Sequence, residues 1–154
     1  MQPAEILTIF VNMNEIQWLT DGATQFPPID RLQVERWIAE IVADHGKLLG
    51  PVNYIFCGDE KILEVNREFL RHDYYTDIIT FDNTRGRRIS GDIFLSLDTV
   101  ASNAELVGAP YERELHRVII HGILHLCGIN DKGPGEREIM EEHEDRALEK
   151  LGML

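Results

Sequence analysis

Two histidines and an aspartate near the end of the chain carry the clearest chemistry in this sequence. His121 and His125 lie at positions i and i+4 of a segment with helical apolar spacing, so both side chains share one face. Two imidazole nitrogens in that arrangement can reach one metal ion. Asp131 follows the helix-ending Gly128 and can bring a carboxylate to the same ion. Two histidines and one carboxylate leave a coordination position open, which is what a catalytic zinc site requires.

The same histidines could instead be partly buried side chains satisfied by hydrogen bonds, because an HxxxH pair on a helix is common by chance. The metal interpretation is favoured because these histidines interrupt an otherwise apolar helix, where unpaired imidazoles would be costly to bury. Metalloproteases of the HExxH type carry a glutamate general base directly after the first histidine. Here that position is Gly122, so the sequence disfavours peptide hydrolysis by that mechanism.

The elements that must position these residues form an α+β pattern. Strands are predicted at Ile6–Val11, from Val52 to Phe56, at Thr76–Phe81, and from Ile89 to Leu97 as the partner of a hairpin. Helices are predicted from the capping Asp30 to Gly46, after Asp59, from Asp98 to about Leu106, from Pro110 to Cys127, and at Glu136–Leu151. The order β-α-β-α-β-β-α-α-α predicts a small mixed four-stranded sheet packed with helices.

Length and composition predict one globular domain over residues 1–154. Hydrophobic residues make up 44% of the chain and charged residues 27%, which excludes disordered and fibrous classes. No apolar run approaches the roughly 20 residues that a membrane span needs, so no membrane partner is expected. The net charge of −12 argues against broad, non-specific nucleic-acid binding but allows a local basic patch. Two cysteines and the lack of a signal peptide predict a cytoplasmic protein.

Several segments together resemble one known family. The segment HGILHLCGIND, from His121 to Asp131, resembles the HGxLHLxGxDH signature of the YbeY endoribonucleases. The family's N..YR..D..TDVLSF block is resembled by Asn66–Phe69, Asp73 and Thr76–Phe81. Gly91–Ile93 resembles the GDI strand of the family, and Met140 also fits. The resemblance covers about residues 50–150. It implies a zincin-like (metalloprotease-like) fold and a zinc-dependent, single-strand-specific endoribonuclease that matures the 3′ end of 16S rRNA. One zinc ion per chain, single-stranded rRNA and the small ribosomal subunit are the implied partners, without DNA.

This chain departs from the family pattern at two positions. The third ligand of the family is histidine where this chain has Asp131, and a carboxylate remains an acceptable zinc ligand. The family's arginine aligns with Leu70, and the nearest guanidinium is that of Arg71. One residue along a helix is a rotation of about 100°. We therefore assign the catalytic arginine role to Arg71 on the condition that the helix ends there and the backbone leaves helical geometry.

A run of arginines follows the third predicted strand. Arg85, Arg87 and Arg88 crowd one loop, within a segment (residues 66–90) that has five basic and four acidic residues and so a net charge of +1. These arginines are predicted to contact RNA phosphates, and the alternative is a solvated hairpin turn.

Two other functions remain open from the sequence. The chain could hydrolyse another substrate, such as a peptide or small ester, or it could be a non-catalytic, ribosome-associated protein with a structural metal. An open coordination position would argue against the second. Asp77 and Asp92 could either cap turns or orient the metal ligands.

Overall fold

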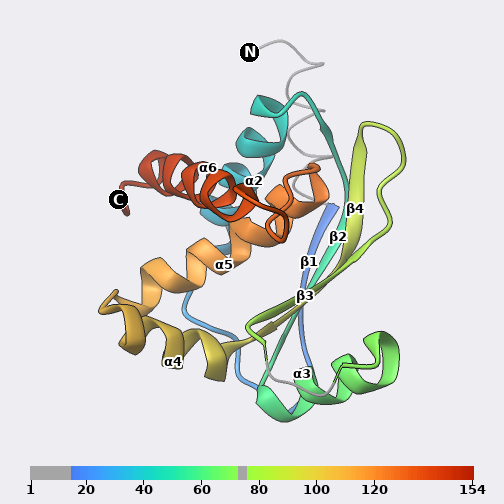
Figure 1. Cartoon of the computed structure of the whole chain (residues 1–154), viewed down its shortest axis with the longest axis vertical. Helices are drawn as coiled ribbons and strands as arrows, with labels where there is room; N and C mark the ends of the chain where they lie inside the picture. The colour runs from blue at the N-terminus through green and yellow to red at the C-terminus, as the bar shows by residue number, and fades with distance from the viewer. Residues whose placement is uncertain (1–14, 73–75) are drawn as a thin grey trace.

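The described residues form a sheet of four strands in the order β1–β2–β4–β3 (Figure 1). The computed structural model describes residues 15–72 and 76–154. The strands are β1 (Ile16–Thr20), β2 (Leu48–Cys57), β3 (Ile78–Asp82) and β4 (Arg88–Ser96). β1, β2 and β4 run parallel, and β3 pairs antiparallel with β4 as a hairpin. The predicted mixed four-stranded sheet is therefore confirmed.

The helices follow the predicted order. They are α2 (Arg31–Asp44), α3 (Asp59–Val65), the π-helical turn η1 (Asn66–Leu70), α4 (Leu97–Val107), α5 (Tyr111–Leu126) and α6 (Glu136–Lys150). The strand predicted at Ile6–Val11 lies outside the described residues. The first described strand, Ile16–Thr20, was not predicted, because five residues with only Ile16 and Trp18 as apolar inward positions give a weak alternation.

Helix α5 is central to the packing of the fold. It contacts β3 and β4 through one face and is flanked by α2, α4 and α6, all on one side of the sheet (Figure 1). Ile119, Ile120, Ile123 and Leu124 are fully buried on it. The Tyr54 hydroxyl donates a hydrogen bond to the Ile119 carbonyl oxygen at 2.6 Å and ties β2 to the helix. These contacts hold α5 rigidly against the sheet, so residues on its other face have a fixed platform.

Gly122 packs closely against the sheet. A Cβ atom added there would lie 3.0 Å from Cδ1 of Ile93 and 3.1 Å from Cδ1 of Ile78. Residue 122 thus faces the sheet rather than solvent, and it leaves no room for a long side chain.

None of the helices in residues 15–72 and 76–154 has the length and apolar character to cross a membrane.

Candidate active site

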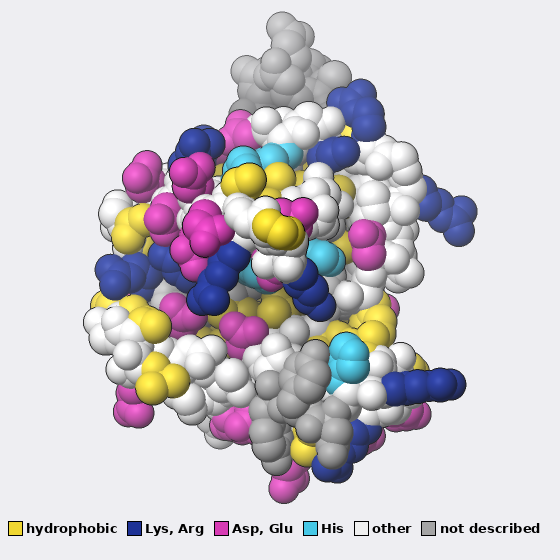
Figure 2. Space-filling view, in the orientation of Figure 1, with side chains coloured by type: hydrophobic (Ala, Val, Ile, Leu, Met, Phe, Trp, Pro, Cys, Tyr) yellow, Lys and Arg dark blue, Asp and Glu magenta, His cyan; other side chains and the backbone are white. Residues whose placement is uncertain are grey.

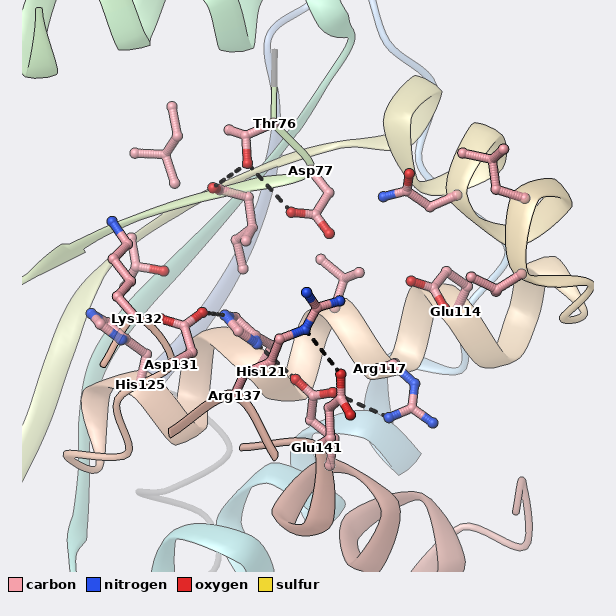
Figure 3. A pocket seen from close by; sticks show the side chains of 18 of the residues that line it. Thr76, Asp77, Glu114, Arg117, His121, His125, Asp131, Lys132, Arg137 and Glu141 are labelled. Carbon is pink, nitrogen blue, oxygen red and sulfur yellow. Dashed lines mark hydrogen bonds and ion pairs between the residues drawn. The ribbon is translucent and has the colours of Figure 1, made fainter. Parts of the chain in front are cut away.

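A cleft of about 1070 Å³ runs along the outer face of α5. The helix contributes Glu114, Arg117, His121 and His125, which recur every three or four residues and therefore form one stripe (Figure 3). Residues from η1, β3, α4, the loop after α5 and the start of α6 complete the walls. Figure 2 shows the hollow in this face, with basic, acidic and histidine side chains around it.

His121 is held from both of its ring nitrogens. Its Nδ1 donates a hydrogen bond to Oε2 of Glu144 at 2.7 Å, and its Nε2 lies 3.3 Å from Oδ2 of Asp131. Burial would lower the pKa of His121, but the hydrogen bond and charge of Glu144, with smaller contributions from Asp131 and Asp77, raise it above its ordinary value. The ring orientation of His121 is therefore fixed, with Nε2 directed at Asp131.

Glu144 is the least exposed of the described acidic residues that line the cleft, with 5% of its surface accessible. Its second carboxylate oxygen accepts a hydrogen bond from Arg117 at 3.1 Å, and the other end of that guanidinium bonds Asp145 at 2.8 Å. These two acidic partners, against the opposing effect of burial, raise the pKa of Arg117. A buried carboxylate thus links a histidine of α5 to an arginine of the same helix, which keeps both side chains in place.

The donor atoms fit a tetrahedral transition-metal ion. Two ligands bound to zinc at about 2.0–2.1 Å lie roughly 3.3 Å apart, and the Nε2 of His121 and the Oδ2 of Asp131 are separated by 3.3 Å. Donation of the Nδ1 proton to a carboxylate leaves the lone pair of His121 on Nε2, as metal-bound histidines usually have it. The structure therefore brings together two of the three predicted ligands.

The third predicted ligand, His125, lines the same cleft one turn further along α5 (Figure 3). No cluster of three His, Cys, Asp or Glu side chains close enough to share an ion occurs among the described residues. Gly128, with a φ of 98°, ends α5 and turns the chain so that Asp131 returns to the cleft. A backbone with positive φ favours glycine at that position.

The helix ends directly before Arg71, as the assignment of the arginine role to this residue requires. Turn η1 ends at Leu70, and Arg71 has a left-handed backbone with a φ of 56°. Its N–H bonds the carbonyl of Asn66, five residues back, which is the π-helical pattern. Leu70 and His72, on either side of Arg71, line the cleft, whereas Arg71 is not among its described lining residues.

The described residues that line the cleft do not include Arg85, Arg87 or Arg88. All three lie at the turn of the β3–β4 hairpin. Arg87 donates to the Gly46 carbonyl at 3.0 Å, and Arg88 pairs with Glu15 at 2.8 Å.

Sequence reasoning missed the basic residues that do line the cleft. They are Arg113, Arg117, Lys132 and Arg137. Arg117 and Arg113 precede His121 by one and two turns of α5, and Lys132 follows Asp131 directly, so helical spacing from the histidines was a usable signal. Glu144 lies on another helix, and only the packing of α6 on α5 brings it near His121.

Asp77 lies on the cleft wall formed by the start of β3, and α5 forms another wall (Figure 3). Burial raises the pKa of its carboxyl, although the charge of His121 and the Thr76 hydroxyl act in the opposite direction. A partly desolvated carboxyl beside the candidate metal ligands is a group that can accept or donate a proton.

These features define an α+β protein whose cleft lining includes two histidines and an aspartate, which are residue types that bind metal in many metal-dependent hydrolases. Comparison with known proteins gives the family. The family model named Endoribonuclease YbeY matches residues 20–152, and the chain belongs to this family.

The relatives are similar over nearly their whole length. An endoribonuclease YbeY from Bacteroides thetaiotaomicron is 63% identical over 133 residues, which are 86% of this chain and 96% of that protein. The one from Parabacteroides distasonis is 66% identical over 124 residues, 80% of this chain and 87% of that protein. The solution structure of TM1509 from Thermotoga maritima matches with a TM-score of 0.59 and 26% identity, over 88% of this chain and 91% of that one.

Proposed function

We propose that this protein is an endoribonuclease that cleaves single-stranded rRNA in maturing the 3′ end of 16S rRNA, with one zinc ion held by His121, His125 and Asp131. The observation that carries the proposal is the 3.3 Å approach of His121 Nε2 to the Asp131 carboxylate in a chain whose relatives are named endoribonucleases. The zincin-like (metalloprotease-like) character of the fold is part of the same proposal.

Charge explains why the cleft needs a cation to bind a phosphodiester. The described residues of its lining include six acidic and four basic side chains, a net charge of −2 with neutral histidines. A divalent ion brings this total to zero, so the phosphate of the substrate no longer meets a repulsive field. RNA binding and metal binding should therefore be coupled.

The bound ion would supply Lewis-acid polarisation of a phosphoryl oxygen and acidification of water. Glu144 keeps the proton on Nδ1 of His121 and so presents Nε2 to the ion, and Arg117 holds Glu144 in place. Lys132 and Arg137 line the cleft and can face the non-bridging phosphate oxygens. We assign the proton-transfer role to Asp77, because its carboxyl lies in the cleft with a pKa raised by burial.

Gly122 separates this proposal from peptide hydrolysis. The position that carries the general base in HExxH enzymes faces Ile93 and Ile78 of the sheet, whose methyl carbons would lie 3.0–3.1 Å from any Cβ atom at residue 122. A glutamate side chain there would enter the sheet instead of the cleft. The proton acceptor must therefore come from another element, and β3 offers Asp77.

Arg71 is proposed as a catalytic cation that binds the reacting phosphate. The assignment is supported by the end of η1 at Leu70 and by the left-handed backbone of Arg71, which takes this residue out of the helix as the assignment requires. Leu70 is part of the described cleft lining and Arg71 is not, so the guanidinium would have to reach the phosphate from the rim of the cleft. The hairpin arginines Arg85, Arg87 and Arg88 are proposed to bind phosphates outside the cleft, where a longer RNA or the small ribosomal subunit would extend.

The cellular setting is proposed as the cytoplasm, with residues 1–154 as one domain. Two free, buried cysteines support a reducing compartment. The net charge of −12 supports a requirement for specific contacts and gives no reason to expect binding to duplex DNA.

The test combines metal analysis with a substrate panel. Purified protein is assayed for bound metal and for cleavage of single-stranded RNA, duplex RNA, single-stranded DNA and casein, with and without a chelator. We expect about one zinc ion per chain and chelator-sensitive cleavage of single-stranded RNA alone. His125→Ala should lose both metal and cleavage, whereas His143→Ala, a histidine of α6 outside the described cleft lining, should keep both. Casein cleavage without RNA cleavage, or full metal occupancy in His125→Ala, would contradict the proposal.

A further inference from the structure

The end of α4 carries two exposed apolar side chains that line the same cleft as His121. Leu106 is 82% exposed and Val107 is 68% exposed, and we call this pair the apolar lip. Asn103, which is three and four residues earlier, also lines the cleft and lies on the same face of the helix. Val100 and Ala104 face the interior, so α4 is already anchored and does not need the lip for its own packing.

The apolar lip is at the opposite end of the cleft from the candidate metal ligands. His121 is twelve positions after Ala109 in the chain, and almost all of these positions are in α5. Twelve residues of α-helix extend roughly 18 Å. Figure 3 shows α4 beside the part of α5 that carries Glu114, with His121 and His125 further along. Figure 2 shows hydrophobic side chains over the end of α4 that leads into α5. The cleft volume of about 1070 Å³ exceeds the size typical of a site for one small ligand.

The side chains between the two ends follow the chemistry of a single nucleic-acid strand. Arg113 lines the cleft on the intervening part of α5, and it forms no ion pair within residues 15–72 and 76–154. The amide of Asn103 makes no hydrogen bond to any described residue. A nucleobase has apolar faces and a polar edge, and phosphates alternate with bases along the strand. The apolar lip with Asn103 suits a base, and Arg113 suits a phosphate.

A protein partner fits the apolar lip less well. Stable protein interfaces bury about 1,200–2,000 Å² in total, far more than two aliphatic side chains provide. The lip is also continuous with the cleft that holds the candidate metal ligands, so a strand bound there would pass over it. Size and continuity both favour the RNA as its occupant.

We propose that the apolar lip is a nucleobase subsite, in which an unpaired base a few nucleotides from the cleaved phosphodiester packs on Leu106 and Val107. The edge of that base faces the Asn103 amide. The inference rests on the proposed function, because its occupant is the RNA substrate. A base in a duplex has both faces stacked on neighbouring bases, so the subsite would favour single-stranded RNA.

The test is a double-mutant cycle between protein and RNA. A short single-stranded RNA of one sequence is prepared intact and with a single abasic residue at each position in turn. The affinity of each RNA is measured by fluorescence anisotropy for the wild type, for Leu106→Ala and for Leu32→Ala. Leu32 is an exposed leucine of α2 outside the described cleft lining and serves as the matched control. Cleavage is followed in parallel.

We expect Leu106→Ala to weaken binding of the intact RNA by roughly fivefold, because part of a base face loses its apolar contact. One abasic position should weaken binding to the wild type by a similar factor, and at that position Leu106→Ala should add little further loss. Leu32→Ala should match the wild type throughout. An equal effect of Leu106→Ala on every abasic RNA, or unchanged affinity for the intact RNA, would overturn the subsite. The proposed function would fail separately if the protein bound the RNAs with this position-specific pattern of affinities but did not cleave them.

Discussion

Replacement of Glu144 by glutamine tests whether the buried carboxylate controls the metal site. The glutamine carbonyl can still accept the Nδ1 proton of His121, so the ring keeps its orientation. The negative charge is lost, and the new amide group offers hydrogens to the guanidinium of Arg117, which is itself a donor. Because Glu144 is 5% exposed, water does not replace the lost interactions.

The expected magnitude follows from the geometry of the pair. The 2.7 Å hydrogen bond between His121 and Glu144 is charge-assisted, and such bonds are roughly twice as strong as neutral ones. Loss of an outer partner of a metal-binding histidine typically costs 10- to 100-fold in metal affinity, or about 1.4–2.7 kcal/mol. Glu144→Gln keeps a neutral hydrogen bond and should lose about tenfold. Glu144→Ala removes the acceptor and should lose about 100-fold.

The assay is competition for zinc with a chromophoric chelator at fixed pH. Glu141→Gln is the matched control, since Glu141 lies on the same helix and lines the same cleft but pairs with the exposed Arg137. Its metal affinity should equal that of the wild type. Circular dichroism on each variant confirms that the fold is retained. If Glu144→Gln binds zinc as tightly as Glu141→Gln, the carboxylate has only a packing role and the reasoning fails.

Four further outcomes follow from the same geometry, and a fifth from the buried thiol of β2. Asp131→His should keep metal and move the acidic limb of the pH–rate profile to lower pH, because a neutral ligand leaves the ion more positive; an unmoved limb would exclude Asp131 from coordination. Lys132→Ala should reduce the salt dependence of RNA binding by about 0.7 in log–log slope for one lost phosphate contact, and equal slopes would remove Lys132 from the interface. Arg88→Ala should change the slope only for RNAs long enough to reach the hairpin, so an effect on the shortest substrate would contradict its position. Burial raises the pKa of Asp77, so its folded form holds a proton at higher pH than its unfolded form and stability falls as pH rises above about 4. Asp77→Asn should therefore stabilise the metal-free protein to urea at pH 7 while cleavage falls about 100-fold, and lower stability with full activity would refute both roles. Burial raises the pKa of the Cys57 thiol to about 12, so a thiol reagent at pH 8 should modify it only at the rate of unfolding, as measured by absorbance; rapid modification of native protein would show that the side chain is accessible.

The sequence predicted the element order and the helix of the metal motif because both depend on local patterns. The spacing of His121 and His125 identifies a shared helix face, and Gly128 marks the end of that helix. The strand Ile16–Thr20 was missed because its alternation is short, and the predicted strand at Ile6–Val11 lies outside the described residues. The equally short β3 was predicted because β-branched and aromatic side chains follow one another along it, whereas a glutamine and a leucine interrupt them in Ile16–Thr20.

The cleft was predicted only in part because most of its chemistry is non-local. Glu144 meets His121 across 23 positions of sequence, and nothing near either residue signals the contact. The arginine run at 85–88 was chosen from its local charge density, yet hairpin geometry carries it away from the described cleft lining. The basic residues of the cleft are spaced along α5, follow Asp131 directly or lie on α6, so they form no run in the sequence.

The aspartate that this chain has in place of the family's third histidine changes the charge that the RNA substrate would meet in the cleft. The family signature has histidine at the position of Asp131, and a carboxylate there lowers the local charge by one unit. The next residue is Lys132, which lines the same cleft and restores that unit next to the ligand. A protein of net charge −12 binds a polyanion where local positive charge offsets the overall repulsion, and a metal ion in the cleft would add to that local charge. A divalent metal ion would thus add two positive charges to those of the four described basic side chains that line the cleft, besides serving as its reactive centre, and this would tie recognition of the strand to readiness for cleavage.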